Sequence, residues 1–127
     1  MGYVILIVDD SETMRLMLER TLHMTRLPMD EIIKAENGRN ALAILKERWV
    51  DLVMTDLNMP EMAGDELIDK IKNDSVLKDL PVVVISTEGN ETVIQELHEK
   101  GIQGYLRKPF TPEHVRDLII KTIGEWK

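Results

Sequence analysis

Five short apolar runs alternate with five amphipathic segments along this chain of 127 residues. The apolar runs are rich in β-branched residues and predict strands at 4–8, 32–35, 52–54, 82–85 and 104–106. The runs at 4–8, 52–54 and 82–85 are apolar throughout, which is typical of parallel strands covered by helices on both faces. The other two runs are weaker, so we expect them nearer the edges of the sheet.

Between the strands, apolar residues return at three- and four-residue spacing, which predicts amphipathic helices. The five stripes consist of Met14, Met17, Leu18 and Leu22; Ala41, Leu42 and Leu45; Leu67, Ile68 and Ile71; Val93, Ile94 and Leu97; and Val115, Leu118, Ile119, Ile123 and Trp126. Met24 and Met29, like Met14 and Met17, are interpreted as core or loop-packing residues that fill irregular gaps. Ser11 is placed to cap the first helix.

The alternation of strand and helix predicts the fold class. Right-handed crossovers between successive parallel strands give an α/β fold, a doubly wound five-stranded parallel sheet with five helices on its two faces. A chain of this length, with 43% apolar residues and no linker rich in Pro, Gly or Ser, is expected to form a single domain over residues 1–127. The periodicity alone leaves the order of the strands open.

Charge and cysteine content remove several classes of function. A net charge of −7 argues against a non-specific binder of nucleic acid or anionic membranes, because phosphate groups repel such a surface. The sequence has no cysteine, which excludes disulfides, thiolate chemistry and thiolate zinc sites. The apolar stretch near the N-terminus is too short for a signal peptide or a membrane span, so a cytoplasmic protein is expected.

Polar residues stand where four of the predicted strands end: Asp9 and Asp10, Asp56, Ser86 and Lys108. Because the carboxyl ends of parallel strands meet at one edge of a sheet, these side chains are expected to converge on one site. Three carboxylates supply the hard oxygen ligands that Mg²⁺ accepts, and they raise one another's pKa values when no metal is bound. The combination predicts phosphoryl transfer, with Asp56 as the nucleophile and Lys108 within reach of a phosphoryl oxygen.

Over essentially its whole length the chain resembles the receiver domain of two-component response regulators, and among these the stand-alone chemotaxis regulators. The resemblance rests on Asp9-Asp10, on Asp56 within the segment TDLNMPEMAG, on Ser86, and on Lys108-Pro109-Phe110. It implies the flavodoxin-like strand order 2-1-3-4-5 and Mg²⁺ as the cofactor. It also implies that Asp56 is the phosphoacceptor, which a sensor histidine kinase would convert to 4-aspartylphosphate.

The resemblance assigns roles to further residues around the acceptor. The backbone carbonyl of Asn58 would be an additional Mg²⁺ ligand beside Asp9, Asp10 and Asp56. Ser86 and Tyr105 would form the switch that reads the phosphoryl group. Asn58 and Glu88 would set the lifetime of that group, and their polar character implies a short one.

Two positions depart from the family pattern. Thr87 stands where Ala or Gly is usual after the switch hydroxyl, and its branched side chain is expected to narrow access to the site. Ala63 stands where Asp or Asn commonly precedes the glycine of the third helix. This removes a side-chain cap worth about 1 kcal/mol, of which Asp65 is expected to recover a part through the helix dipole.

The function implied by the resemblance is that of a phosphorylation-activated response regulator. Such a protein is a signalling protein with Mg²⁺-dependent self-phosphorylation from phosphodonors and with autodephosphorylation. Because the sequence ends at Lys127, soon after the last predicted helix, output is expected to be binding of a monomer to another protein, such as the flagellar motor switch in chemotaxis. The alternative is a phosphorelay intermediate that passes the phosphoryl group to a histidine phosphotransfer protein.

Two other classes of protein share parts of this pattern. A phosphatase of the haloacid dehalogenase type also uses an Asp nucleophile, but it needs a second Asp two residues later, where this chain has Asn58. A flavin or nucleotide binder of similar topology needs loops that cradle phosphate groups, whereas acidic loops repel them. Both classes are therefore disfavoured.

Overall fold

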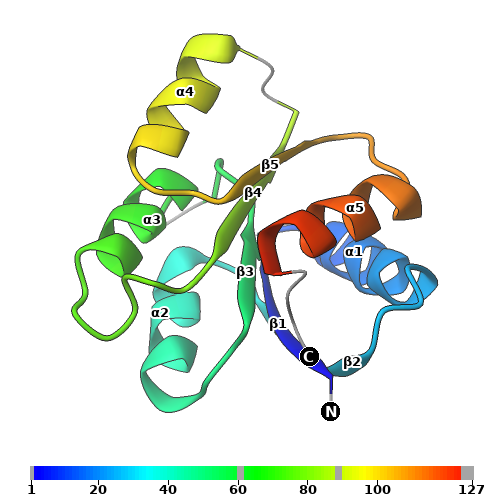
Figure 1. Cartoon of the computed structure of the whole chain (residues 1–127). Helices are drawn as coiled ribbons and strands as arrows, with labels where there is room; N and C mark the ends of the chain where they lie inside the picture. The colour runs from blue at the N-terminus through cyan, green and yellow to red at the C-terminus, as the bar shows by residue number, and fades with distance from the viewer. Residues whose placement is uncertain (1, 60–61, 88–89, 124–127) are drawn as a thin grey trace.

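Five parallel strands form one sheet in the order β2-β1-β3-β4-β5 (Figure 1). The computed structural model describes residues 2–59, 62–87 and 90–123, and its strands are β1 Tyr3–Val8, β2 Met29–Ala35, β3 Leu52–Thr55, β4 Val82–Ser86 and β5 Gly104–Arg107. All five predicted strands are confirmed, and the largest change is at β2, which begins at Met29 rather than at residue 32. The strand order implied by the family resemblance is confirmed as well, with the two weak runs at the edges.

The helices that connect the strands are α1 Glu12–Met24, α2 Gly38–Glu47, α3 Gly64–Lys72, α4 Glu91–Glu99 and α5 Pro112–Ile123. α1 and α5 cover one face of the sheet, and α2, α3 and α4 cover the other (Figure 1). This arrangement confirms the predicted doubly wound α/β fold. No helix in the described part of the chain is long and apolar enough to cross a membrane.

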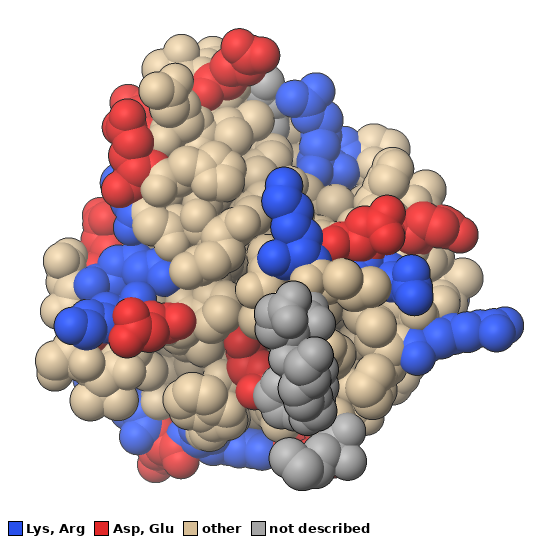
Figure 2. Space-filling view, viewed as in Figure 1, with Lys and Arg blue, Asp and Glu red and all other residues tan. Residues whose placement is uncertain are grey.

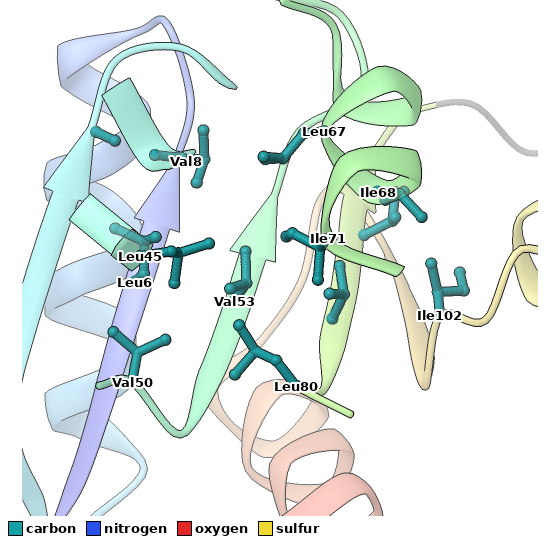
Figure 3. Close-up of a cluster of buried hydrophobic side chains, with 14 of the residues drawn as sticks. Leu6, Val8, Leu45, Val50, Val53, Leu67, Ile68, Ile71, Leu80 and Ile102 are labelled. Carbon is teal, nitrogen blue, oxygen red and sulfur yellow. The ribbon is translucent and has the colours of Figure 1, made fainter. Parts of the chain in front are cut away.

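Alternation of side chains along the central strands divides the interior into two apolar layers. Leu6, Val8 and Val53 point toward α2 and α3, where they pack with residues such as Leu45, Leu67, Ile68 and Ile71 (Figure 3). Ile5 and Ile7 point the other way, toward α1 and α5. Each fully buried Leu or Ile contributes about 1.5–3 kcal/mol through loss of contact with water, so both faces anchor the strand ends where the polar residues stand.

The methionines of α1 differ from the prediction. Met17, which the apolar stripe predicts to pack on the sheet, is 51% exposed, and Met24, interpreted as a core or loop-packing residue, is 58% exposed. The buried stripe of this helix is instead made by Leu18, Thr21 and Leu22. Thr21 can occupy a buried position because its hydroxyl donates a hydrogen bond of 2.8 Å to the backbone carbonyl of Met17.

Four helix starts carry side-chain caps, and at α5 the cap is Thr111, whose hydroxyl accepts a hydrogen bond from the amide of His114 at 3.1 Å. The Ser11 hydroxyl accepts a hydrogen bond from the amide of Met14 at 3.2 Å, as predicted for the first helix. Asn37 and Asn90 cap α2 and α4 in the same way. Ala63 at the start of α3 offers no such bond, which confirms the missing cap that the sequence indicated.

Candidate functional site

The sheet itself brings the polar residues together at the carboxyl ends of β1, β3 and β5. Asp9, Asp56 and Lys108 directly follow these strands, and each donates its backbone amide to the last residue of a neighbouring strand. The accepting carbonyls belong to Ala35 for Asp9 at 3.1 Å, Val8 for Asp56 at 2.9 Å and Ser86 for Lys108 at 3.0 Å. The three residues are therefore held by extensions of the sheet rather than by free loops.

Three carboxylates converge at this edge. One ligand oxygen from each of Asp9, Asp10 and Asp56 lies within 4.8 Å of the others. Asp9 is buried, Asp56 is half-buried and Asp10 is exposed, so the cluster opens to solvent on the side of Asp10. Carboxylate oxygens at this spacing, with room for water on one side, form the kind of donor set that Mg²⁺ accepts.

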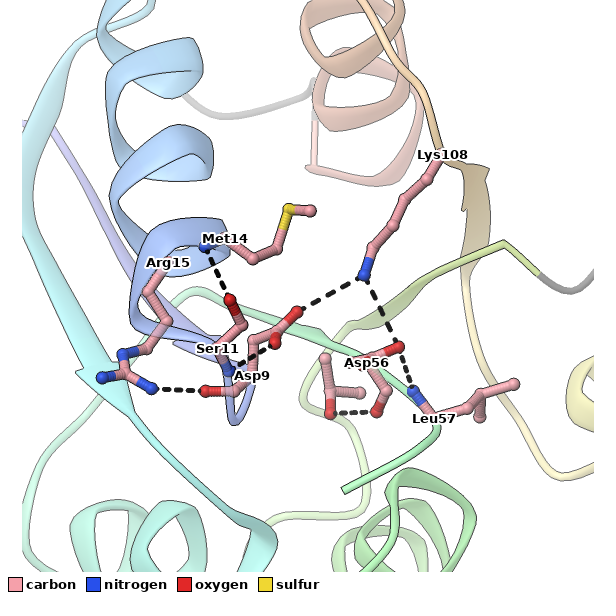
Figure 4. A network of polar contacts seen from close by, with 8 residues as sticks. Asp9, Ser11, Met14, Arg15, Asp56, Leu57 and Lys108 are labelled. Atoms are coloured by element: carbon pink, nitrogen blue, oxygen red, sulfur yellow. Dashed lines mark hydrogen bonds and ion pairs between the residues drawn. The ribbon is translucent and has the colours of Figure 1, made fainter. Parts of the chain in front are cut away.

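Lys108 lies beside two of these carboxylates (Figure 4). Its Nζ atom is 3.5 Å from Oδ2 of Asp9 and 3.8 Å from Oδ1 of Asp56. Three ionised carboxylates and one ammonium leave two negative charges in the cluster. A divalent cation would balance that charge, so the residues present fit such an ion.

The electrostatics of Asp56 follow from its position at the rim of the sheet. Burial raises the pKa of the Asp56 carboxyl above its ordinary value, and the neighbouring Lys108 works against this rise. The carboxylate of Asp9 raises this pKa further, and that of Asp10 adds a smaller rise. The amide of Leu57 lowers the pKa by donating a hydrogen bond of 2.8 Å to Oδ1 of Asp56. The predicted effect of the carboxylates on one another is confirmed in direction for Asp56, but burial is the larger cause.

The start of α3 packs tightly against the acceptor loop. The amide of Gly64 donates a hydrogen bond of 2.8 Å to the carbonyl of Leu57. A Cβ atom at Gly64 would collide with the backbone carbonyl oxygen of Asp56 and would lie 2.8 Å from Cα of Leu57. The sequence marked Gly64 only as a turn residue, so this close approach of two backbones is a structural finding.

Arg15 is a second residue that the sequence pattern did not indicate. Its Nη1 atom donates a hydrogen bond of 2.6 Å to the backbone carbonyl of Asp9 (Figure 4). The signal that could have revealed it is the placement of a cation near the N-terminus of a helix, where the helix dipole disfavours positive charge.

Ser86 lies on the inner strand β4, and Tyr105 lies on the neighbouring edge strand β5. Ser86 ends β4 and is 1% exposed, and its carbonyl accepts the amide of Lys108. Tyr105 is half-buried in β5, pairs with Val84 of β4, and packs against the apolar layer on the α3 and α4 side. The backbone of β4 and β5 thus connects the predicted switch residues with Lys108.

Asn58 and Thr87, two further residues singled out by the sequence, are exposed. The side chain of Asn58 is exposed and helps to line a cavity of about 300 Å³ between the loop after β3 and α4. Thr87 is exposed as well, directly after the buried Ser86. Glu88, the other predicted lifetime residue, lies outside the described residues.

Comparisons with known proteins agree with this geometry. Residues 5–120 match the sequence model of the response regulator receiver domain. A chemotaxis protein CheY homolog of Campylobacter jejuni is 37% identical over 121 residues, which cover 94% of this chain and 92% of that protein.

Solved structures show the same similarity. The chemotaxis response regulator CheY4 of Vibrio cholerae superposes with a TM-score of 0.85 at 32% identity, covering 96% of this chain and 99% of the other. A Mn²⁺-bound form of the response regulator Rcp1 gives a TM-score of 0.80 at 28% identity, covering 93% and 92%. These relatives are covered almost completely, so the similarity extends across the sheet and all the strand ends described above.

Proposed function

This chain belongs to the response regulator receiver domain family, and from that membership we propose that it is a signalling switch activated by phosphorylation of Asp56. In this proposal a sensor histidine kinase supplies the phosphoryl group, and the phosphorylated protein binds a downstream target. The observation that carries the proposal is the placement of Asp56 beside two further carboxylates, with Nζ of Lys108 3.8 Å from its Oδ1.

The transfer step follows from the groups at the site. An oxygen of the Asp56 carboxylate attacks phosphorus, and a bond forms between them while the bond from phosphorus to the donor nitrogen breaks. The electron pair of that bond goes to the imidazole of the donor histidine, which takes up a proton. The Lys108 ammonium is placed to donate to an oxygen of the transferred group, whose negative charge it offsets.

Asp9, Asp10 and Asp56 would hold a divalent cation, together with the backbone carbonyl of Asn58. When bound, Mg²⁺ supplies charge neutralisation for the phosphoryl oxygens. The charge balance of the carboxylate cluster and the Mn²⁺ in the related Rcp1 structure support this assignment. The same site would release the phosphoryl group to water, and the identities of Asn58 and Glu88 would set how fast this happens.

The readout is proposed to run through the ends of β4 and β5. A phosphoryl group adds nearly two negative charges, which can draw the Ser86 hydroxyl inward and strengthen the contact with Lys108. Movement of Ser86 would free space for Tyr105 and change the surface formed by α4, β5 and α5. Acidic and basic side chains are interspersed on the face of the molecule in Figure 2, which suits a protein partner better than nucleic acid.

The relatives favour chemotaxis over a phosphorelay. Several curated proteins of similar sequence are chemotaxis proteins, and this chain matches them over nearly their whole length. We therefore propose that the kinase is of the chemotaxis type, that the target is a protein such as the flagellar motor switch, and that the protein works in the cytoplasm.

The proposal is tested by incubating the protein with a small phosphodonor and Mg²⁺ and measuring its mass. We expect one added phosphoryl group on the wild-type protein and none on Asp56→Asn. Addition of a chelator should abolish the labelling. Equal labelling of Asp56→Asn would disprove the acceptor assignment, and labelling that survives the chelator would disprove the metal site.

A further inference from the structure

Arg15 reaches back from α1 to the main chain of the metal-site loop. Its guanidinium donates a hydrogen bond of 2.6 Å to the backbone carbonyl of Asp9. A charged donor makes this bond stronger than one between neutral groups. The cation stands in the N-terminal half of α1, where the helix dipole disfavours it, so helix stability does not explain its position.

The two carboxylates of the loop are held very differently. Asp9 is fixed at its amide by Ala35, at Oδ1 by the amide of Ser11 at 2.9 Å, and at Oδ2 by Lys108. The carboxylate of Asp10 is exposed and makes no hydrogen bond or ion pair with any residue that the structure describes. The placement of Asp10 therefore depends on the backbone, above all on the peptide plane between Asp9 and Asp10.

We propose that Arg15 is a positioning residue for the divalent-cation site. The oxygen that Arg15 holds belongs to the peptide between Asp9 and Asp10, so this bond sets the direction in which the Asp10 side chain leaves the chain. The inference rests on the proposed function, because it assumes that Asp10 is a metal ligand. Loss of a residue that orients a ligand typically weakens metal binding by about 10-fold to 100-fold.

The charge of Arg15 would act in the opposite direction. A positive charge beside the cluster repels a metal cation, so its removal alone should tighten binding. Positioning and charge therefore predict changes of opposite sign when Arg15 is replaced by an uncharged residue. The direction of the measured change decides between them.

The surroundings of Arg15 allow this substitution. The side chain borders an open hollow of about 470 Å³ that it shares with Lys34, Glu36 and Asn40. Arg15→Met keeps much of the aliphatic length without the donors, and Arg15→Lys keeps the charge and a shorter donor. Arg20→Met is the matched control, since it removes an exposed cation from the same helix.

The experiment is a titration of the metal-free proteins with Mg²⁺ at constant ionic strength, followed through the amide NMR signals of Asp10, Ser11 and Leu57. We expect Arg15→Met to bind Mg²⁺ about 10-fold or more weakly than wild type, as is typical when the support of a ligand is lost. Arg15→Lys should fall between the two, and Arg20→Met should match wild type. The readout concerns folded protein, so a change in stability alone does not alter it.

Unchanged or tighter binding by Arg15→Met would overturn the inference. If Arg15→Met fails to fold, Arg15→Lys decides: weaker binding supports the positioning role, and wild-type affinity overturns it. A wild-type protein whose amide signals do not respond to Mg²⁺ would overturn the proposed metal site and this inference with it. If wild type binds and Arg15→Met binds equally well, the proposed metal site stands and only the role of Arg15 is lost.

Discussion

The backbone of Gly64 packs against the backbone carbonyl of Asp56 so closely that no side chain fits between them. The amide of Gly64 also donates to the carbonyl of Leu57, which fixes the loop that leaves the acceptor. We expect Gly64→Ala to destabilise the protein by about 1–3 kcal/mol, because the added methyl group overpacks the contact. Urea unfolding measures this change.

The sign of the change in unfolding free energy separates overpacking from the ordinary preference of helices for alanine. In an open helix, alanine is more favourable than glycine by roughly 0.8–1 kcal/mol. A neutral or stabilising Gly64→Ala would therefore contradict the close approach. Gly104→Ala is the control with a milder expected effect, because the added atom would meet the end of the flexible Leu118 side chain.

Ala63 offers a site for stabilisation. Its backbone is extended at φ −68° and ψ 162°, as for an N-cap residue, but its side chain cannot accept from the first amides of α3. In the first turn, the amide of Glu66 donates instead to Oδ1 of Asp65 at 3.0 Å. Ala63→Ser should raise the free energy of unfolding by about 1 kcal/mol by supplying the missing acceptor. Ser11→Ala, which removes the existing cap of α1, should lower it by about the same amount. Equal thermal unfolding of Ala63→Ser and wild type would show that the α3 amides are satisfied in another way.

Much of this architecture could be predicted from the sequence, because each central strand is apolar throughout and ends in a polar cluster. The convergence of Asp9, Asp56 and Lys108 followed from the parallel pairing of those strands. The strand order did not follow from the periodicity and required the family resemblance. The start of the edge strand β2 was predicted three residues too late, because its first residues include the exposed Asp30 and Glu31 and show no apolar run.

Other features depended on information that a pattern of residue types lacks. Met17 and Met24 are exposed because the face of α1 that packs on the sheet is made by Leu18, Thr21 and Leu22. Thr21 is polar, so the spacing of apolar residues does not reveal that it is buried. The contact of Gly64 with Asp56 and the bond from Arg15 to Asp9 both involve backbone oxygens, which every residue carries. The pattern of apolar and polar residues therefore does not predict such contacts.

The raised pKa of Asp56 predicts how stability depends on pH in the absence of metal. A carboxyl whose pKa is higher in the folded state than in the unfolded state favours folding while protonated, and this contribution is lost as pH rises through the folded-state pKa. The ordinary value is 3.8, so the loss should begin as the pH rises above that range. Asp56→Asn lacks the ionisation and should be the more stable protein at pH 7, by on the order of 1 kcal/mol or less, since Asp56 is partly open to water.

Urea unfolding of the two proteins between pH 4 and pH 7, about the range over which raised carboxyl groups titrate, measures the difference. The gap should widen with rising pH and narrow when Mg²⁺ is added to the wild type. A gap that stays constant with pH would show that the ionisation of Asp56 is not its cause.

Lys108→Ala should separate acceptance of the phosphoryl group from signalling. The variant keeps Asp56 and the backbone bond to Ser86, so it should still be labelled by a phosphodonor. It lacks the ammonium that would contact the phosphoryl group, and so it should lose the coupling between phosphorylation and partner binding. In wild type that coupling is expected to be about 1–3 kcal/mol, or roughly 5-fold to 150-fold in affinity.

Titration of the partner against phosphorylated and unphosphorylated protein gives the coupling directly. Ser86→Ala should behave like Lys108→Ala, whereas Lys46→Ala, which removes an exposed cation from α2, should keep the wild-type coupling. Full coupling in Lys108→Ala would exclude a route from the phosphoryl group through Lys108 and Ser86 to Tyr105.

The amides of Asp9, Asp56 and Lys108 are bonded to the ends of neighbouring strands, so these residues can move apart only when the sheet opens. Any adjustment of these residues to a phosphoryl group is therefore confined to their side chains, without rearrangement of the backbone that carries them. Because these residues are already held at the strand ends, the protein can respond to phosphorylation without a slow closure of a loop over the site. Under the proposed function, the protein would follow kinase activity with a delay set by the making and breaking of one phosphorus–oxygen bond.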